Sequence, residues 1–219
     1  MAHIFDIIGP IMVGPSSSHT AGAARIGKLA RIMLQEPVHR AEIKLYGSFA
    51  ETYLGHGTHL AVLGGLLGYD PDDLRIRQSD SLAREAFGYE FVVLSGVPVD
   101  HPNTMRLSLA GETNQIDILG VSVGGGRIRV TEIDGFPVKL NGENIVLVIH
   151  SVDRPGVITL LTSCLASENI NIGNMTVSRQ GKGSSVVMTI EIDAPAEPRV
   201  LDRVRSTEGV QRATQIIPL

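Results

Sequence analysis

Cysteine is almost absent from this chain of 219 residues, which contains only Cys164. A disulfide within the chain is therefore impossible, and this fits a reducing compartment such as the cytoplasm. Tryptophan is absent and aromatic residues make up 4% of the sequence, so few rings are available for stacking on nucleic-acid bases. The net charge is -4 and no long basic run occurs. These features argue against binding to nucleic acid or to an anionic membrane surface.

Long uninterrupted apolar runs are also missing. The apolar N-terminus MAHIFDIIGPIMVGP is interrupted by Asp6 and Pro10 and has no basic segment before it. We therefore expect a short buried segment there, not a signal peptide or a membrane span. Hydrophobic residues make up 43% and charged residues 19% of the chain, which is enough for a packed core in one large or two small domains.

The C-terminal third has the clearer pattern of secondary structure. Continuous β-branched stretches, apolar residues at helical spacing and turn residues alternate there. The predicted order is β-α-β-β-α-β, a ferredoxin-like unit. The predicted elements are Asn144–Val152, Val157–Asn169, Ile170–Gln180, Ser184–Asp193, Glu197–Gly209 and Val210–Pro218.

The first two thirds are less regular and mix both element types. We expect a helix from Thr20 to Gln35, a strand from Arg40 to Phe49 and a helix from His59 to Gly68. Four further strands are expected between Glu90 and Phe136. The turn-rich segment Asp134–Asn144 is the expected domain boundary, so the fold class is α+β with an N-terminal α/β domain.

A row of hydroxyls precedes the first predicted helix, in GPSSSHTAGAARIGK. A helix N-terminus presents free N–H groups and a partial positive charge, and capping it requires only one side-chain oxygen. Four hydroxyls and an imidazole exceed that need. Together they predict a receptor for a small carboxylate or phosphate, formed by Ser16, Ser17, Ser18, His19 and Thr20.

A serine hydrolase is an alternative for the same motif, since serine and histidine are both present. Ser18 and His19 are adjacent in sequence, so we expect their side chains to diverge. The serines of this row also do not stand in the G-x-S-x-G pattern of the α/β-hydrolases.

Other motifs are weaker when taken alone. His56 lies between two glycines, where the backbone can approach a ligand closely, and His59 adds an i, i+3 spacing that two imidazoles alone do not make into a zinc site. His101 and Asn103 lie in a turn that is either a binding loop or a polar corner. The triple glycine in SVGGGRI predicts a tight turn.

Several of these segments, in this order, strongly resemble the β chain of the iron–sulfur-dependent L-serine dehydratases of bacteria. They are IIGPIMVGPSSSHTAGAARIGKLAR, LYGSFAETYLGHGTH, VPVDHPNTMRLSL and GVSVGGGRIRVTEIDGF. The resemblance implies a subunit of an enzyme that converts L-serine to pyruvate and ammonia. It implies catalytic roles for His19 and His56, with substrate-binding roles for Ser16, Ser17, Ser18, Thr20 and Asn103. His59 stands where relatives often have an acidic residue, and it receives no role.

The resemblance also implies a [4Fe–4S] cluster, which needs several thiolates. This chain has one cysteine, in the C-terminal domain, so a separate α chain is expected to supply the ligands. The alternative is a non-catalytic amino-acid-sensing protein that binds serine in both domains.

The C-terminal part, with DRPG and NINIGNM, resembles an ACT domain, an amino-acid-sensing module. The implied effector-binding residues are Asp153, Gly156 and Asn171, and the implied assembly is a homodimer through this domain. The N-terminal part is similar to the allosteric substrate-binding domain of some phosphoglycerate dehydrogenases. The expected domains are residues 1–143 and residues 144–219.

Overall fold

The computed structural model describes residues 11–219, so most of the predicted buried N-terminal segment lies outside the described residues. Of the part that is described, Val13 is buried but Ile11 is 85% exposed. The chain divides into two compact units, one ending at Asp134 and the other beginning at Gly135. Between residues 11 and 219, no helix is both long and apolar enough to span a membrane.

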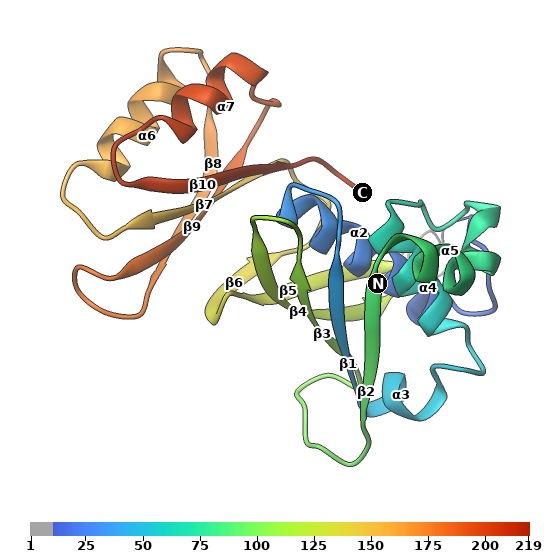
Figure 1. Cartoon of the computed structure of the whole chain (residues 1–219). Coiled ribbons are helices and arrows are strands. Elements are labelled where there is room, and N and C mark those ends of the chain that lie inside the picture. The colour runs from blue at the N-terminus through green and yellow to red at the C-terminus, as the bar shows by residue number, and fades with distance from the viewer. Residues whose placement is uncertain (1–10) are drawn as a thin grey trace, which may run out of the picture. The chain divides into compact units, whose positions relative to one another are not determined.

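The first sheet has six strands in the order β2-β1-β3-β4-β5-β6 (Figure 1). Strand β1 pairs in parallel with β2 and antiparallel with β3, and the β3–β4 and β4–β5 pairs are antiparallel. The strands are β1 (Arg40–Tyr46), β2 (Gly88–Leu94), β3 (Asn103–Ala110), β4 (Gln115–Gly124), β5 (Arg127–Ile133) and β6 (Phe136–Leu140).

Strand β6 corrects one expectation, because it occupies the segment that was predicted to be a turn-rich linker. Phe136, Val138 and Leu140 are buried and alternate with exposed residues, which is the period of a half-buried strand. Turn residues on both sides of this short alternation conceal it in the sequence. The domain boundary between residues 143 and 144 stays a prediction.

Helices α2 (Gly22–Leu34) and α4 (Thr58–Leu67) pack against each other, and α2 also packs on strands β3, β4 and β5. Gly65 permits this close approach, because a Cβ atom there would overlap the carbonyl oxygen of Ala24. The glycines of this segment therefore support helix packing and do not interrupt α4. The unit also contains the π-helix η1 (Ser17–Ala21) and three further short helices: α3 (Gly47–Thr52), the 3-10 helix η2 (Leu74–Gln78) and α5 (Ser79–Ala86).

The strand predicted to run from Arg40 to Phe49 ends earlier than expected, at Tyr46. Gly47 follows with φ +52, and a Cβ atom on it would lie 2.5 Å from the carbonyl oxygen of Pro102. The backbone therefore turns at Gly47, and Phe49 belongs to α3.

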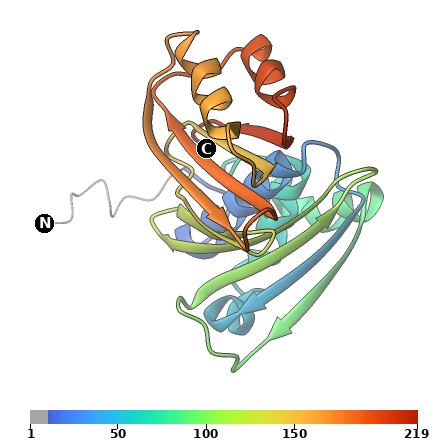
Figure 2. The same ribbon diagram turned by 90° about the vertical axis from the view of Figure 1, so that its left-hand side faces the viewer.

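The second unit has a four-stranded antiparallel sheet in the order β10-β7-β9-β8, with α6 and α7 on one face (Figure 1 and Figure 2). This is the predicted ferredoxin-like order, and the predicted fold class is confirmed. Cys164 is 6% exposed within the core of this unit, as a small apolar side chain would be. The elements are β7 (Val146–Val152), α6 (Val157–Ala166), β8 (Ile172–Arg179), β9 (Ser185–Ile192), α7 (Pro198–Arg205) and β10 (Val210–Ile216).

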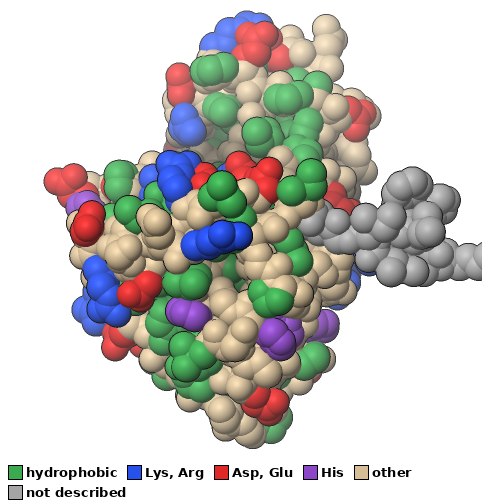
Figure 3. Space-filling model, turned by 90° about the vertical axis from the view of Figure 1, so that its right-hand side faces the viewer, with side chains coloured by type: hydrophobic (Ala, Val, Ile, Leu, Met, Phe, Trp, Pro, Cys, Tyr) green, Lys and Arg blue, Asp and Glu red, His purple; other side chains and the backbone are tan. Residues whose placement is uncertain are grey.

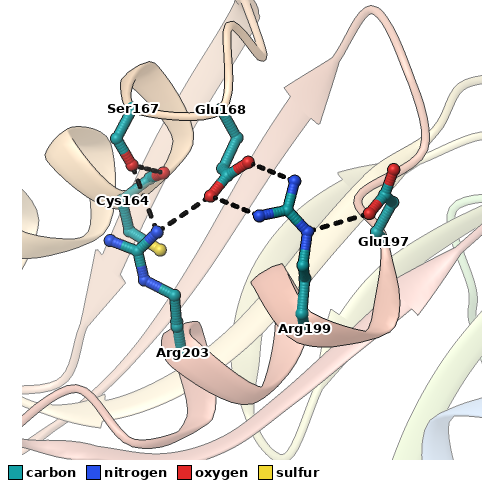
Figure 4. Close-up of polar contacts among 6 residues, drawn as sticks. All are labelled: Cys164, Ser167, Glu168, Glu197, Arg199 and Arg203. Carbon is teal, nitrogen blue, oxygen red and sulfur yellow. Dashed lines mark hydrogen bonds and ion pairs between the residues drawn. The ribbon is translucent and has the colours of Figure 1, made fainter.

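An ion-pair network joins the end of α6 to α7 (Figure 4). The carboxylate of Glu168, whose side chain is 14% exposed, accepts from Arg199 at 2.7 Å and from Arg203 at 3.0 Å. Arg199 also contacts Glu197, the N-cap residue of α7, at 2.9 Å. These charged hydrogen bonds fix the two helices relative to each other above the apolar core.

Candidate active site

The hydroxyl row forms a single π-helical turn, Ser17–Ala21, that leads into α2. Ser16 is its N-cap residue, and the Ser16 Oγ accepts from the backbone N–H of His19 at 3.2 Å. The helical conformation thus begins three residues before the predicted start at Thr20, and most of the hydroxyls belong to the turn itself. Capping of this helix N-terminus therefore uses one hydroxyl, that of Ser16.

His19 is 8% exposed, and hydroxyls of this chain lie at both of its ring nitrogens. The Nδ1 atom lies 3.1 Å from the Ser18 Oγ and 3.4 Å from the Ser16 Oγ. The Nε2 atom lies 3.1 Å from the Ser48 Oγ. The expectation that the side chains of Ser18 and His19 diverge was wrong, because the π-helical turn brings the two together.

The same contacts bear on the hydrolase alternative. In a Ser-His-Asp triad, one imidazole nitrogen contacts the nucleophile and the other contacts a carboxylate. Among the described residues, the side chains hydrogen-bonded to the ring of His19 are all serines, and the backbone of Ser48 also interacts with the ring. The arrangement therefore lacks the carboxylate that orients and charges the imidazole of a hydrolase.

The ring of His56 lies beside that of His19, as the shared site predicted for them requires. The ring centroids are 4.7 Å apart with an interplanar angle of 60°, and the ring of Phe49 contacts that of His19 edge to face at 5.2 Å. The hydroxyl of Thr20 donates to the carbonyl oxygen of His56 at 3.2 Å. This bond ties the loop before α4 to the hydroxyl turn.

A pocket of about 300 Å³ opens beside His56, and His19 is not among its lining residues. Its polar lining includes Thr20, His56 and His59, and its apolar lining includes Leu54 and Leu60. The Nδ1 atom of His56 is buried and has no hydrogen-bond partner within the described part of the chain. The Nδ1 atom of His59, in contrast, lies 3.0 Å from the carbonyl oxygen of Tyr53. Histidine side chains lie among hydrophobic ones on one face of the molecule (Figure 3).

Burial lowers the pKa of His19 below the usual 6.5, and the neighbouring His56 lowers it further. Both causes oppose the charged imidazolium. His19 is therefore neutral at pH 7, with one nitrogen that donates and one that accepts.

Asn103, the first residue of β3, lies next to the end of β1, where Ser48 follows. It forms an isolated antiparallel bridge with Gly47, next to Ser48. Its side-chain amide donates to the carbonyl oxygen of Ser122 at 3.4 Å, and its backbone N–H donates to the Nδ1 of His101 at 3.1 Å. The predicted tight turn at the triple glycine, Gly124–Gly126, is confirmed between β4 and β5.

The predicted effector residues of the second unit do not come together within one copy. Asp153 accepts from the backbone N–H of Gly183 and from Arg179, and both bonds lower its pKa below the usual range, Gly183 the more. Asn171 donates to Asp193 at 2.8 Å.

Gly183 and Asp193 flank opposite ends of β9, which is about 26 Å long at 3.3 Å per residue. Gly156, with φ +92, is the N-cap residue of α6 and lies close in sequence to Asp153. Asp153 and Asn171 therefore do not contact a common small ligand within one copy of the chain.

The sequence pattern described as serine dehydratase beta chain matches residues 3–97, and that of the ACT domain matches residues 145–209. The probable L-serine dehydratase, beta chain, of Bacillus subtilis is 43% identical over 215 residues, which cover 97% of this chain and 97% of that protein. This chain belongs to the serine dehydratase β-chain family. The resemblance found in the sequence is confirmed.

Two further relatives extend this finding. This chain is 35% identical to the L-serine dehydratase, beta chain, of Peptoniphilus asaccharolyticus over 212 residues, which cover 96% of this chain and 94% of that protein. It is 24% identical to a D-3-phosphoglycerate dehydrogenase of Synechocystis over 192 residues, which cover 87% of this chain and 35% of that enzyme. The similarity to part of the latter agrees with the second resemblance stated above.

The side chains of the β chain do not fit the ligand set of an iron–sulfur cluster. The described residues contain no group of three His, Cys, Asp or Glu side chains placed to hold a metal. Cys164 is buried in the core of the second unit and is the chain's only thiol. A four-iron cluster requires several thiolates, so this chain alone does not supply them.

Ser48 is the site residue that sequence reasoning missed. Its segment, YGSFAETYLGHGTH, was recognised for its histidines alone. A Gly-Ser pair directly after a buried strand signals a sharp turn with an exposed hydroxyl, and that signal was available. The contact with His19 was not, because 29 residues separate the two in sequence.

Proposed function

We propose that this β chain is the subunit of an L-serine dehydratase that binds L-serine and moves protons during its conversion to pyruvate and ammonia. The observation that carries the proposal is the close pair of His19 and His56 beside the hydroxyl turn. The named activity of the relatives supplies the reaction. Dehydration removes the α-proton and the β-hydroxyl of serine, and the resulting aminoacrylate tautomerises to an imine that water hydrolyses.

Binding of the substrate falls to the hydroxyl turn and to Asn103. The hydroxyls of Ser16, Ser17, Ser18 and Thr20, with the Asn103 amide, provide donors for a carboxylate and acceptors for an ammonium group. Ser17 and Ser18 are half-buried, so their hydroxyls lie at the boundary between the turn and solvent.

Proton transfer falls to the two imidazoles. A neutral His19 accepts a proton at one nitrogen, and the proximity of His56 opposes a charge on both rings at once. The buried and unpartnered Nδ1 of His56 adds a group whose hydrogen-bonding partner comes from outside the described chain.

The partner in this proposal is a cysteine-bearing α chain, which the β-chain name of the relatives implies. A [4Fe–4S] cluster would be held there, since the donors on this chain do not fit one. The second unit would pair with its copy in a homodimer and bind a small amino acid between the copies. An amino-acid sensor without catalysis is the alternative, and it predicts no pyruvate from any combination of chains.

Substitution of the two histidines tests the proposal in the α–β complex. His19→Ala and His56→Ala should each lower the rate of pyruvate formation by about 10²-fold or more, the usual effect of losing a group that transfers protons. His59→Ala is the matched control, because His59 lines the same pocket as His56 but its ring contacts the carbonyl oxygen of Tyr53. It should retain most of the activity. Near-normal turnover of His19→Ala, with the fold intact by circular dichroism, would contradict the proposal.

A further inference from the structure

Both ring nitrogens of His19 have hydrogen-bond partners within the chain. Hydroxyls occupy both ring nitrogens, and the rings of Phe49 and His56 pack against its sides. A neutral imidazole accepts a proton at its unprotonated nitrogen, and the hydroxyl at that nitrogen must then accept a hydrogen bond instead of donating one. Its orientation and its protonation state therefore depend on the hydroxyls at both ends.

The two ends differ in how they are built. At Nδ1, Ser16 and Ser18 belong to the same helical turn as His19, and their hydroxyls lie 3.3 Å apart. One of them can substitute for the other there, since both lie within 3.4 Å of Nδ1. At Nε2, the Ser48 Oγ is the hydroxyl in contact, and it comes from a different element, the start of α3.

The backbone at Ser48 is held on both sides. Gly47 fits against Pro102 only because it lacks a Cβ atom, and it is bridged to Asn103. The hydroxyl of Thr52 donates to the carbonyl oxygen of Ser48 at 2.8 Å, one turn further along. The position of the Ser48 hydroxyl is thus fixed by α3 and by the adjacent ends of strands β1 and β3, independently of the helix that carries His19.

We propose that Ser48 is a positioning residue, whose hydroxyl holds the Nε2 of His19 and so sets the tautomer and orientation of that ring for proton transfer. The inference rests on the proposed function, in which His19 moves protons. In it, Ser48, His19 and Ser18 form one hydrogen-bonded relay across the imidazole, and Asn103 helps to hold the turn that carries Ser48.

The first test reads His19 directly and needs no activity. Nitrogen chemical shifts of the imidazoles are measured by NMR on the full-length ¹⁵N-labelled chain, with His19→Gln to assign the signals. Ser48→Ala should change the Nδ1 and Nε2 shifts of His19, and Ser48→Thr, which keeps the hydroxyl, should restore them. Ser81→Ala is the control, because the Ser81 hydroxyl donates to the carbonyl of Gln78, the N-cap residue of its own helix. Unchanged His19 shifts in Ser48→Ala would overturn the inference whatever the activity.

The second test uses the α–β complex and L-serine. Ser48→Ala should lower kcat about 10- to 100-fold with KM changed less than about 3-fold, since the substrate-binding hydroxyls remain. The acid limb of the pH profile should move to lower pH, because the imidazolium loses a hydroxyl that accepts from it. Ser48→Thr should recover both. Shifted NMR signals with unchanged kcat and pH profile would overturn the positioning role. A wild-type complex without activity would remove the proposed function and this role with it, while the NMR result would still decide whether Ser48 holds His19.

Discussion

At the scale of single residues, His19 links the candidate site to stability. Its pKa in the folded chain lies below the 6.5 of a free imidazole because burial, and then His56, disfavour the charged form. Below pH 6.5 the unfolded chain therefore binds a proton at this residue that the folded chain does not bind. The stability that the neutral ring contributes is complete above pH 6.5. This contribution to stability decreases as the pH is lowered from 6.5 to the lower pKa of His19 in the folded chain.

This sign gives a prediction for unfolding. Between pH 7.5 and pH 5.5, the wild-type chain should lose more stability than the His19→Gln variant, since glutamine does not titrate in this range. The measurement is urea unfolding of the full chain at several pH values, followed by circular dichroism. Parallel losses in the two chains would show that the folded-state pKa of His19 is not depressed.

At the scale of elements, the contact of α2 with α4 depends on a glycine. Alanine in place of Gly65 would gain about 1 kcal/mol of helix propensity. Its Cβ atom would, however, overlap the carbonyl oxygen of Ala24, and the backbone nitrogen of Lys28 lies 2.7 Å from the same position. Backbone atoms on a packed helix yield less readily than the end of a side chain, so the clash should outweigh the propensity.

Gly65→Ala should therefore destabilise the chain by about 3 kcal/mol, in the upper part of the range for overpacked cores. Gly88→Ala is the control, because the nearest atom to a Cβ there lies at 3.9 Å, in ordinary contact. Thermal unfolding of both variants measures the difference. Equal melting temperatures of the Gly65→Ala and Gly88→Ala variants would mean that α2 and α4 can move apart without loss of stability.

The elements also show what the sequence could and could not predict. Strongly apolar segments such as β7, β9 and α4 appear close to where the pattern placed them. Strand β6 was missed because five alternating residues between turns carry little signal. The strand predicted to Phe49 was too long because the close approach of Gly47 to Pro102, where the chain turns, involves a distant segment.

In the candidate site too, local motifs could be recognised in the sequence, and contacts between distant segments could not. The hydroxyl row and His56 were recognised because they are local motifs, and the structure places His19 and His56 side by side. Ser48 was missed, and the contact of Ser18 with His19 was misjudged, because both depend on the path of the chain. The pairing of Asp153 with Asn171 stays a prediction, since one copy keeps the two apart.

At the scale of the whole molecule, the second unit leaves β10 and β8 as the edges of its sheet. An open edge presents unpaired backbone groups that favour pairing with another strand, and Val177 on β8 is 42% exposed. We expect the full chain to form a homodimer through this unit. Removal of residues 144–219 should yield a monomer in sedimentation velocity. A fragment that sediments as the same oligomer as the full chain would assign the dimer contact to the first unit.

The central claim is that this β chain works as one half of a serine dehydratase. The direct measurement is pyruvate formation from L-serine, under anaerobic conditions, by the chain alone and by the chain co-expressed with its α partner. After supply of iron and sulfide, we expect no cluster absorbance and no pyruvate from the chain alone, because it has a single buried thiol. We expect pyruvate from the complex. Pyruvate from the isolated chain, or none from a complete and cluster-bearing complex, would contradict the account.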